Sequence, residues 1–264
     1  MKKNLLTIPV GWGTLSYRKN GDFPGTALIF IHGAVGDSRL FRSQLKHFGT
    51  RIKTIALDLP GHGHSHSEIM PGLDDFINAI ERVLEEERIE SCVLVGHSMG
   101  GGVCLEAFTR GIRAIAGLVL VSTSPVLPVS SELVRVLDGD DTDSLAEIIV
   151  GAVFSRQVGL LVGIAKNGLY GKQRGDIRNT VRNDIEICNS MDYKGVLSRV
   201  DVPVLIVANR FDRVISCDLT AALHQGIRNS SFVIFEEEGH IPFFENPDSF
   251  NAEVEAFLNN LPSR

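Results

Sequence analysis

Six short runs of apolar residues recur along this chain, and each of them stops at a turn. They lie at residues 26–31, 52–57, 92–95, 115–121, 202–208 and 232–235. The runs are apolar throughout instead of alternating with polar residues, which is typical of strands that are buried on both faces. The pattern therefore predicts a parallel sheet that is covered by helices.

Helical patterns separate several of these runs. Residues 74–88 carry an apolar stripe at helical spacing, with Asp74 and Asp75 in the first turn. Two further helices are predicted, one directly after Ser98 and one after Asn246-Pro247. This alternation indicates an α/β doubly wound, mostly parallel sheet. Segments 5–10 and 13–18 are expected to form an antiparallel hairpin at one edge.

One long segment interrupts this rhythm. Between about residues 125 and 199 no strand-like run ends in a strand-to-helix turn, but four helical patches occur, at 131–137, 144–154, 158–170 and 177–188. So long a connection between strands is unusual for a plain loop. We therefore expect a core made of residues 1–124 and 200–264, with residues 125–199 inserted as a helical lid.

Composition excludes several classes of protein. The 264 residues carry a net charge of −6 and have a sequence pI of about 5.8, whereas a pI above roughly 9 is typical of a nucleic-acid-binding domain. The four cysteines are scattered, which favours a reducing compartment. No apolar run approaches the roughly 18 to 20 residues of a membrane span, and the N-terminal segment does not match a secretory leader. We expect a cytoplasmic protein with neither a nucleic-acid partner nor a membrane span.

The strongest motif is GHSMGG at positions 96–101, which matches the pattern G-x-S-x-G. It follows a predicted buried strand and precedes a predicted helix, as in a nucleophile elbow, the sharp turn that exposes a reactive hydroxyl. Glycines allow the backbones to approach closely, and the N–H groups at the start of the helix favour negative charge. We therefore predict that Ser98 is a nucleophile, and not merely a serine that caps a helix.

A serine hydroxyl needs a general base to become nucleophilic. His240 directly follows the last strand run, at the end of the sheet where ligands bind in open α/β folds. His224 is a weaker candidate because it lies in a helix-like segment. We predict that His240 is the base.

A carboxylate must orient the imidazole of such a base. Asp212 lies just after the run 202–208, and Asp218 is a weaker rival further along. The run 115–121 is followed by Ser122-Thr123-Ser124, with no acid. Asp212 is therefore the predicted orienting acid, and it completes the chain order Ser, Asp, His that this kind of site requires.

Two backbone N–H groups are candidates for an oxyanion hole, which binds the negative oxygen of a reacting carbonyl group. Met99 directly follows the nucleophile, and Ala34 follows His32-Gly33 at the end of an early strand. Donors of this kind each lower the barrier by roughly 2.7–4 kcal/mol. We expect His32 itself to shape its own loop through backbone hydrogen bonds.

Together these motifs resemble the α/β-hydrolase fold superfamily, in particular its lidded serine hydrolases of esterase and monoacylglycerol-lipase type. The matching segments are His32-Gly33, DLPGHGHS at 58–65, GHSMGG at 96–101, Asp212, and Gly239-His240 with Glu245-Asn246-Pro247. The resemblance covers the chain apart from the lid. It implies an α/β-hydrolase fold and a Ser-His-Asp hydrolase that uses no metal and no organic cofactor.

The resulting hypothesis is a carboxylesterase for small-molecule esters of a small or medium apolar acyl group, acting through an acyl-enzyme. Dehalogenases of this fold carry Asp where this chain has Ser98, and C–C bond hydrolases typically carry Asn where His97 stands. C–C cleavage or perhydrolysis on the same triad remains an alternative. A receptor that retains the fold only to bind a small molecule is another.

The second half of the predicted lid is basic. Between residues 150 and 182 one acid, Asp176, accompanies six basic residues: Arg156, Lys166, Lys172, Arg174, Arg178 and Arg182. Methyl-ester esterases that act on acyl-carrier-protein substrates resemble this fold and use basic lid residues to hold the acidic carrier. An acidic acyl carrier protein is thus an alternative partner, although a solvated helix face is the plainer interpretation.

Two other features carry less weight. His62, His64 and His66 alternate near Glu68, but this spacing in a glycine-containing loop matches no closed metal site. Cys104 lies six residues after Ser98 on an apolar helix face, so it is interpreted as part of the core. We therefore expect no metal ligands among these residues.

Overall fold

The computed structural model of the chain describes residues 4–129, 151 and 177–262. Its β-strands in these segments form one nine-stranded sheet in the order β1-β2-β4-β3-β6-β7-β8-β9, with β5 paired to β2. The strands are β1 (Leu5–Val10), β2 (Gly13–Asn20), β3 (Ala27–Ile31), β4 (Thr54–Asp58), β5 (His66–Ser67), β6 (Cys92–His97), β7 (Ile115–Val121), β8 (Val204–Asn209) and β9 (Ser230–Phe235). All six predicted strand runs therefore overlap strands of this sheet.

The centre of the sheet is parallel, as the apolar runs predicted. Strands β4, β3, β6, β7, β8 and β9 pair in parallel, and every residue of β3, β4, β6, β7 and β8 is buried. Ile31 at the end of β3 lies opposite both Leu57 of β4 and Gly96 of β6. The carboxyl ends of three neighbouring strands therefore meet at one edge of the sheet. The predicted antiparallel hairpin of β1 and β2 lies at the other side, with β1 as the outermost strand.

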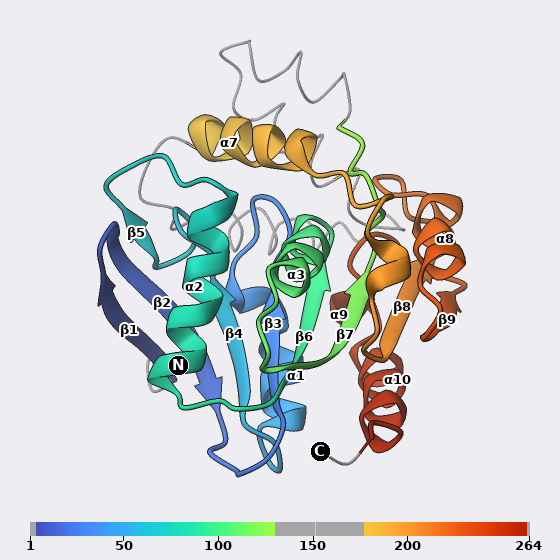
Figure 1. Cartoon of the computed structure of the whole chain (residues 1–264), viewed down its shortest axis with the longest axis horizontal. Helices are drawn as coiled ribbons and strands as arrows, with labels where there is room; N and C mark the ends of the chain where they lie inside the picture. Colours follow the sequence, from blue (N-terminus) through green and yellow to red (C-terminus); the bar gives the residue numbers. More distant parts are fainter. Residues whose placement is uncertain (1–3, 130–150, 152–176, 263–264) are drawn as a thin grey trace.

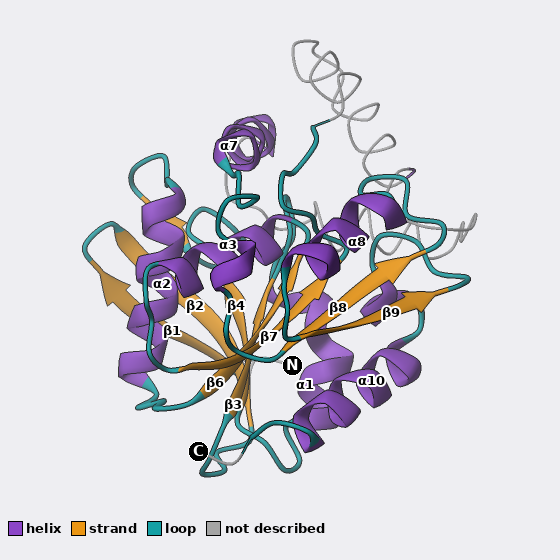
Figure 2. Ribbon diagram, turned by 45° about the vertical axis from the view of Figure 1, so that its right-hand side comes forward, coloured by secondary structure: helices purple, strands orange, loops and turns teal. Residues whose placement is uncertain are grey.

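Helices cover both faces of the sheet, which explains why its strands are apolar on both sides (Figure 2). Phe76, Val103 and Leu223 pack against one face, whereas Phe48 and Val254 pack against the other. The helices are α1 (Arg42–Phe48), α2 (Leu73–Glu86), α3 (Met99–Thr109), α7 (Ile177–Ser190), α8 (Cys217–Gly226), α9 (Pro242–Glu245) and α10 (Pro247–Asn259). Two 3-10 turns, η1 (Ser38–Phe41) and η3 (Leu197–Arg199), complete the described elements. None of the helices in the described part of the chain is long and apolar enough to cross a membrane.

The predicted lid can be followed only at its two ends. Its last helical patch, 177–188, corresponds to α7, which ends two residues later; the patches at 131–137, 144–154 and 158–170 lie outside the described residues, except for residue 151. Val126 and Asp192 form an isolated antiparallel bridge, and the Tyr193 N–H donates to the Pro125 carbonyl at 2.9 Å. The chain therefore leaves the core and returns to it at neighbouring points, which supports an insertion at these positions.

Helix α7 lies across the end of the sheet to which the parallel strands point (Figure 1). One anchor is Asn183, whose side-chain amide donates to the Pro71 carbonyl at 3.0 Å. A second is Met191 just after the helix, whose sulfur lies so close to Gly102 of α3 that a Cβ there would overlap it. This placement puts α7 against α3, the helix that directly follows the predicted nucleophile.

Candidate active site

The turn between β6 and α3 has the geometry of a nucleophile elbow. Ser98 lies between the two elements with φ +53° and ψ −119°, a strained backbone conformation for a residue with a side chain. Its N–H donates to the Val121 carbonyl of β7 at 2.9 Å. A Cβ on Gly100 would overlap the carbonyl oxygens of Ile31 and His32, so only glycine fits there. The strain at Ser98 is thus maintained by tight packing against β3.

The hydroxyl of Ser98 does not cap the helix that follows. Ser98 occupies the N-cap position of α3, yet its side chain makes no capping hydrogen bond. Its carbonyl accepts the Gly101 N–H at 2.8 Å instead. The interpretation of Ser98 as a simple capping residue is therefore wrong, and its hydroxyl stands at the positive end of a helix.

Asp212 and His240 meet although 28 residues separate them. Asp212 follows β8 and His240 follows β9, two strands that run side by side. The Nδ1 atom of His240 lies 2.8 Å from Oδ2 of Asp212, and both side chains are buried. Oδ1 of Asp212 accepts the N–H groups of Val214 and Ile215 at 2.8 and 2.9 Å. With Nδ1 donating to the carboxylate, Nε2 of His240 is left as a base.

His97 connects His240 to the elbow. Its Nε2–H donates to the His240 carbonyl at 2.9 Å, and the two ring centroids lie 4.6 Å apart. Burial, together with the neighbouring His240, keeps the pKa of His97 well below its ordinary value, so the ring is neutral. The residue directly before Ser98 therefore holds the His240 loop beside Ser98. In the sequence, His97 stands out only as a departure from the C–C hydrolases.

The loop after β3 lies against the elbow from the other side. A Cβ on Gly33 would lie 2.9 Å from the Cβ of Ser98 and 2.9 Å from Nδ1 of His97, so the glycine permits this approach. Ala34 follows at an exposed turn, and Met99 is the first residue of α3, where an N–H has no partner within the helix. The Ala34 N–H, one residue after Gly33, and the Met99 N–H, one residue after Ser98, therefore lie on two segments that meet at the elbow.

His32 has the structural role that the sequence predicted. Its Nδ1–H donates to the Gly33 carbonyl at 2.8 Å, and its Nε2 accepts the Leu59 N–H at 3.0 Å. The ring is completely buried, and burial lowers the pKa of His32 to about 4. His32 thus joins the loops after β3 and β4 as a neutral group.

We expect His32 to make the protein less stable as the pH falls from about 6.5 to about 4. In that window the unfolded chain binds a proton on His32 that the folded chain refuses, so the free energy of unfolding decreases by about 3 kcal/mol in all. Urea unfolding of the wild type and of His32→Gln across this range measures the difference, because glutamine does not titrate. Parallel pH profiles for the two proteins would contradict the prediction.

The weaker candidates for the base and for the orienting acid are both exposed on α8. His224 is exposed on α8, and its Nδ1 lies 2.8 Å from the Ser230 hydroxyl. Asp218 is exposed in the first turn of the same helix. Ser122, after β7, is buried and accepts a hydrogen bond of 2.6 Å from the side-chain amide of Asn209.

Two of the alternating histidines bind buried carboxylates. Nε2 of His62 lies 3.0 Å from Oδ2 of Asp184, and the His64 N–H donates to Asp58 at 2.9 Å. In the described segments no three His, Cys, Asp or Glu side chains form a cluster that could hold a metal ion. Cys104 is completely buried, as predicted, and burial raises the pKa of its thiol.

Asp184 is the residue near the site that sequence reasoning missed. It lies on α7 and is completely buried, and its Oδ2 also accepts the Val35 N–H at 2.8 Å. The signal was present in the sequence, because Asp184 shares a helix face with Val181, Ile187 and Cys188, which are buried apolar residues. A charged residue on an apolar stripe indicates a specific buried partner.

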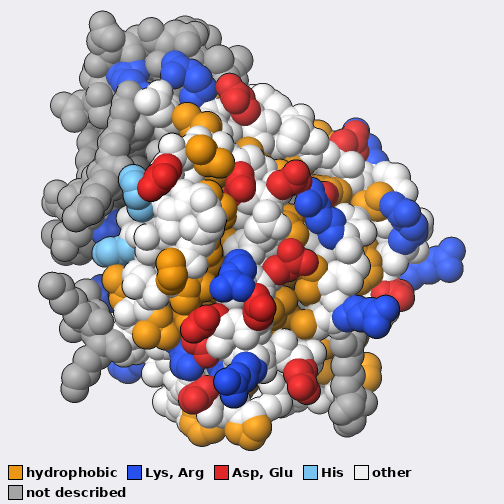
Figure 3. All heavy atoms as spheres, turned by 60° about the vertical axis from the view of Figure 1, so that its left-hand side comes forward, with side chains coloured by type: hydrophobic (Ala, Val, Ile, Leu, Met, Phe, Trp, Pro, Cys, Tyr) orange, Lys and Arg blue, Asp and Glu red, His pale blue; other side chains and the backbone are white. Residues whose placement is uncertain are grey.

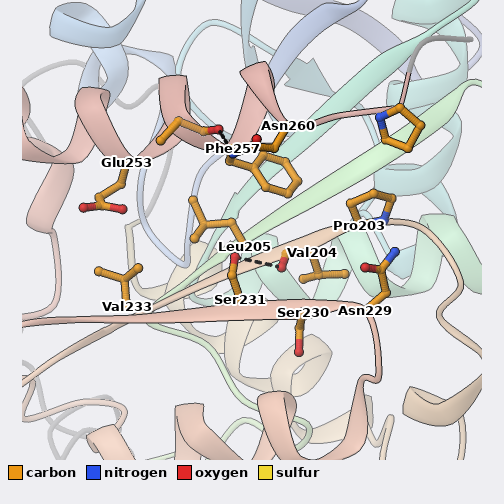
Figure 4. Close-up of a pocket in the computed structure, with 12 residues that line it drawn as sticks. Pro203, Val204, Leu205, Asn229, Ser230, Ser231, Val233, Glu253, Phe257 and Asn260 are labelled. Carbon is orange, nitrogen blue, oxygen red and sulfur yellow. Dashed lines mark hydrogen bonds between the residues drawn. The ribbon is translucent and has the colours of Figure 1, made fainter.

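A hollow of about 520 Å³ lies at the opposite end of the sheet (Figure 4). It is lined by the first residues of β8 and β9, among them Val204 and Ser230, and by α10 residues such as Phe257. Ser98, Asp212 and His240 stand at the carboxyl ends of their strands, so this hollow is separate from them.

On the face drawn in Figure 3, acidic and basic side chains are interspersed and do not gather by sign.

Comparisons with known proteins agree with this fold. The model of the alpha/beta hydrolase family matches residues 28–253. A pimeloyl-[acyl-carrier protein] methyl ester esterase of Aliivibrio fischeri is 23% identical over 266 residues, which cover 96% of this chain and 99% of that protein. An esterase from Rhodococcus sp. ECU1013 superposes with a TM-score of 0.82 at 24% identity, covering 98% of this chain and 100% of that one. An enol-lactonase from Burkholderia xenovorans LB400 reaches a TM-score of 0.86 at 17% identity, covering 97% and 100%.

Proposed function

Because this chain belongs to the alpha/beta hydrolase family, we propose that it is a serine hydrolase that cleaves carboxylic esters through an acyl-enzyme. The observation that carries the proposal is the hydrogen bond between Asp212 and His240. The loop that bears His240 is in turn held by His97 to the elbow that bears Ser98. A strained serine, a buried carboxylate and an oriented imidazole, in this chain order, are the parts that acyl transfer needs. The acyl group is small or medium-sized and apolar.

In the proposed mechanism Ser98 attacks the ester carbonyl while Nε2 of His240 takes the hydroxyl proton. Asp212 holds the imidazole in the correct tautomer and stabilises the imidazolium that forms. The backbone N–H groups of Ala34 and Met99 bind the developing oxyanion. His240 then protonates the leaving alcohol. In the second half of the reaction His240 takes a proton from water, the water attacks the acyl-enzyme, and His240 returns the proton to Ser98 as the acid leaves.

The test of this proposal is a panel of p-nitrophenyl esters from acetate to octanoate, combined with labelling by a fluorophosphonate. We expect steady-state hydrolysis and one label per chain, located on Ser98. Labelling without any steady-state ester hydrolysis would instead support the receptor alternative. Turnover of a C–C substrate or of peroxide and acid, with no turnover of any ester, would support the other reactions on the same triad.

A second candidate substrate is the methyl ester of an acyl chain carried on an acyl carrier protein. The observation that favours it is the similarity to esterases of that name, including the relative from Aliivibrio fischeri. Of the six basic lid residues, Arg178 and Arg182 lie on α7, and the others lie outside the described residues. The rate on a carrier-bound methyl ester, compared with the same ester free in solution, distinguishes the two candidates.

We also propose that residues 125–199 act as a lid over a core made of residues 1–124 and 200–264. The neighbouring points at which the chain leaves and rejoins the core support this division.

The four cysteines are all free, and Cys92, Cys104 and Cys188 are buried. Free thiols fit a reducing compartment, so the proposed location is the cytoplasm.

A further inference from the structure

The carboxylate of Asp184 is buried between three segments that are distant in sequence. Its side chain is completely inaccessible to solvent. Oδ2 accepts the Val35 N–H at 2.8 Å from the loop after β3 and lies 3.0 Å from Nε2 of His62 in the loop after β4. Burying a charged group is costly unless it is paired and hydrogen-bonded, so this arrangement calls for a specific role.

Val35 has a backbone conformation that valine rarely adopts. Its φ is +60°, in the left-handed region, which is a strong outlier for a β-branched residue. The Gly36 N–H donates to the Gly33 carbonyl at 3.1 Å, so residues 33–36 form a β-turn with Val35 in its third position. A positive φ at this position is characteristic of a type II turn and normally requires glycine or asparagine. Some external contact must therefore hold the turn in this form.

The hydrogen bond that the Val35 N–H donates to Asp184 supplies that restraint. This N–H belongs to the central peptide of the turn, the unit whose orientation distinguishes type II from type I. If the hydrogen bond to Asp184 is lost, the peptide can flip and Val35 can return to a negative φ. The Ala34 N–H belongs to the preceding peptide of the same turn, which is joined to the central peptide at the Ala34 Cα and loses its fixed direction when the turn changes form. This N–H is one of the two proposed oxyanion donors.

His62 supplies the charge that allows Asp184 to be buried. Nδ1 of His62 lies 3.1 Å from the Pro60 carbonyl and Nε2 faces Asp184, so both ring nitrogens meet acceptors. Burial alone would lower the pKa of His62, but Asp184 and the Pro60 carbonyl raise it above its ordinary value. Asp184 and His62 thus form a buried ion pair that links α7 to the loops after β3 and β4.

We propose that Asp184 is a positioning residue of the esterase: through the Val35 N–H it holds the turn at 33–36 in the form that presents the Ala34 N–H to the substrate. The oxyanion site is then complete only while α7 is docked on the core. This inference rests on the proposed function, because it assigns a role within that reaction. Asp184 does not touch the reacting atoms, so its effect must appear in kcat and in the binding of transition-state analogues.

The first test compares Asp184→Ala with the matched control Asn183→Ala. Both residues are buried on α7, but Asn183 binds the Pro71 carbonyl and not the turn. We expect Asp184→Ala to lower kcat on p-nitrophenyl butyrate by about 100-fold, the typical effect of losing one oxyanion donor, with little change in KM. Its affinity for a trifluoromethyl ketone should fall in parallel. Asn183→Ala should lower thermal stability without lowering kcat.

The second test is rescue. Asp184→Asn retains an oxygen for the Val35 N–H, and its new NH₂ group takes the place of Oδ1, which has no hydrogen-bond partner within the described residues; it should recover most of kcat. Glycine adopts a positive φ without strain, so Val35→Gly combined with Asp184→Ala should be at least about tenfold faster than Asp184→Ala alone. If Asp184→Ala does not fold, Asp184→Ser replaces it, because its hydroxyl is too short to reach the turn.

The outcomes separate this inference from the proposed function. If the wild type hydrolyses no ester and is not labelled by a fluorophosphonate, the proposed function fails and the inference falls with it. If the wild type is active but Asp184→Ala retains its kcat, only the inference is overturned. The same holds if Asn183→Ala lowers kcat equally, or if Val35→Gly gives no rescue, because Asp184 would then simply anchor the helix.

Discussion

Replacing Ser98 by alanine is expected to slow ester hydrolysis by about 10⁴-fold or more while leaving the fold intact. The change removes the proposed nucleophile, and neither His240 nor the oxyanion donors can replace a covalent intermediate. Stability should barely change, because the Ser98 hydroxyl makes no capping hydrogen bond to α3 and alanine meets the same backbone strain. The variant therefore separates chemistry from folding.

The measurement is kcat/KM on p-nitrophenyl butyrate, with thermal unfolding recorded on the same preparation. Ser249→Ala is the control, because Ser249 is an exposed serine on α10 and has no part in the proposed mechanism. The fluorophosphonate adduct should disappear in Ser98→Ala and persist in Ser249→Ala. A Ser98→Ala protein that hydrolyses the ester at the wild-type rate would refute the assignment of Ser98.

The α/β-hydrolase fold predicted from the sequence is confirmed. It could be predicted because its strongest sequence signals are local. Runs such as 115–121 are apolar at every position, and only a strand covered on both faces needs that pattern. Helix α2 was recognisable from its apolar stripe, and it begins one residue before the predicted segment. Helix α1 was missed because its seven residues are too few to show a clear period.

The candidate site likewise has parts that local sequence patterns indicate and parts that they do not. Ser98 and Met99 could be proposed from six consecutive residues, and Asp212 and His240 from their places after two strands. The pairing of Val35 with Asp184 spans 149 positions and depends on how α7 docks, which no local pattern encodes. A positive φ at Val35 was equally hidden, because valine is among the residues least suited to it.

Asp212→Asn is expected to lower kcat by about 10³- to 10⁴-fold, although it changes only one atom. The N–H groups of Val214 and Ile215 both donate to Oδ1, so an oxygen must remain at that position. The amide NH₂ is then forced into the place of Oδ2 and faces Nδ1 of His240. Nδ1 must become an acceptor, the ring proton moves to Nε2, and His240 can no longer accept the proton of Ser98.

Two measurements test this tautomer argument. Steady-state rates of Asp212→Asn are compared with those of Asp218→Asn, which changes an exposed acid six residues later and should remain near the wild-type rate. Proton NMR should show the low-field Nδ1–H resonance of His240 in the wild type and its loss in Asp212→Asn. An Asp212→Asn enzyme within about tenfold of the wild type would show that this carboxylate does not set the tautomer, since a wrong tautomer costs far more. Equal losses in the two variants would point instead to a general effect of removing negative charge, because of these two acids it is Asp212 that contacts the imidazole.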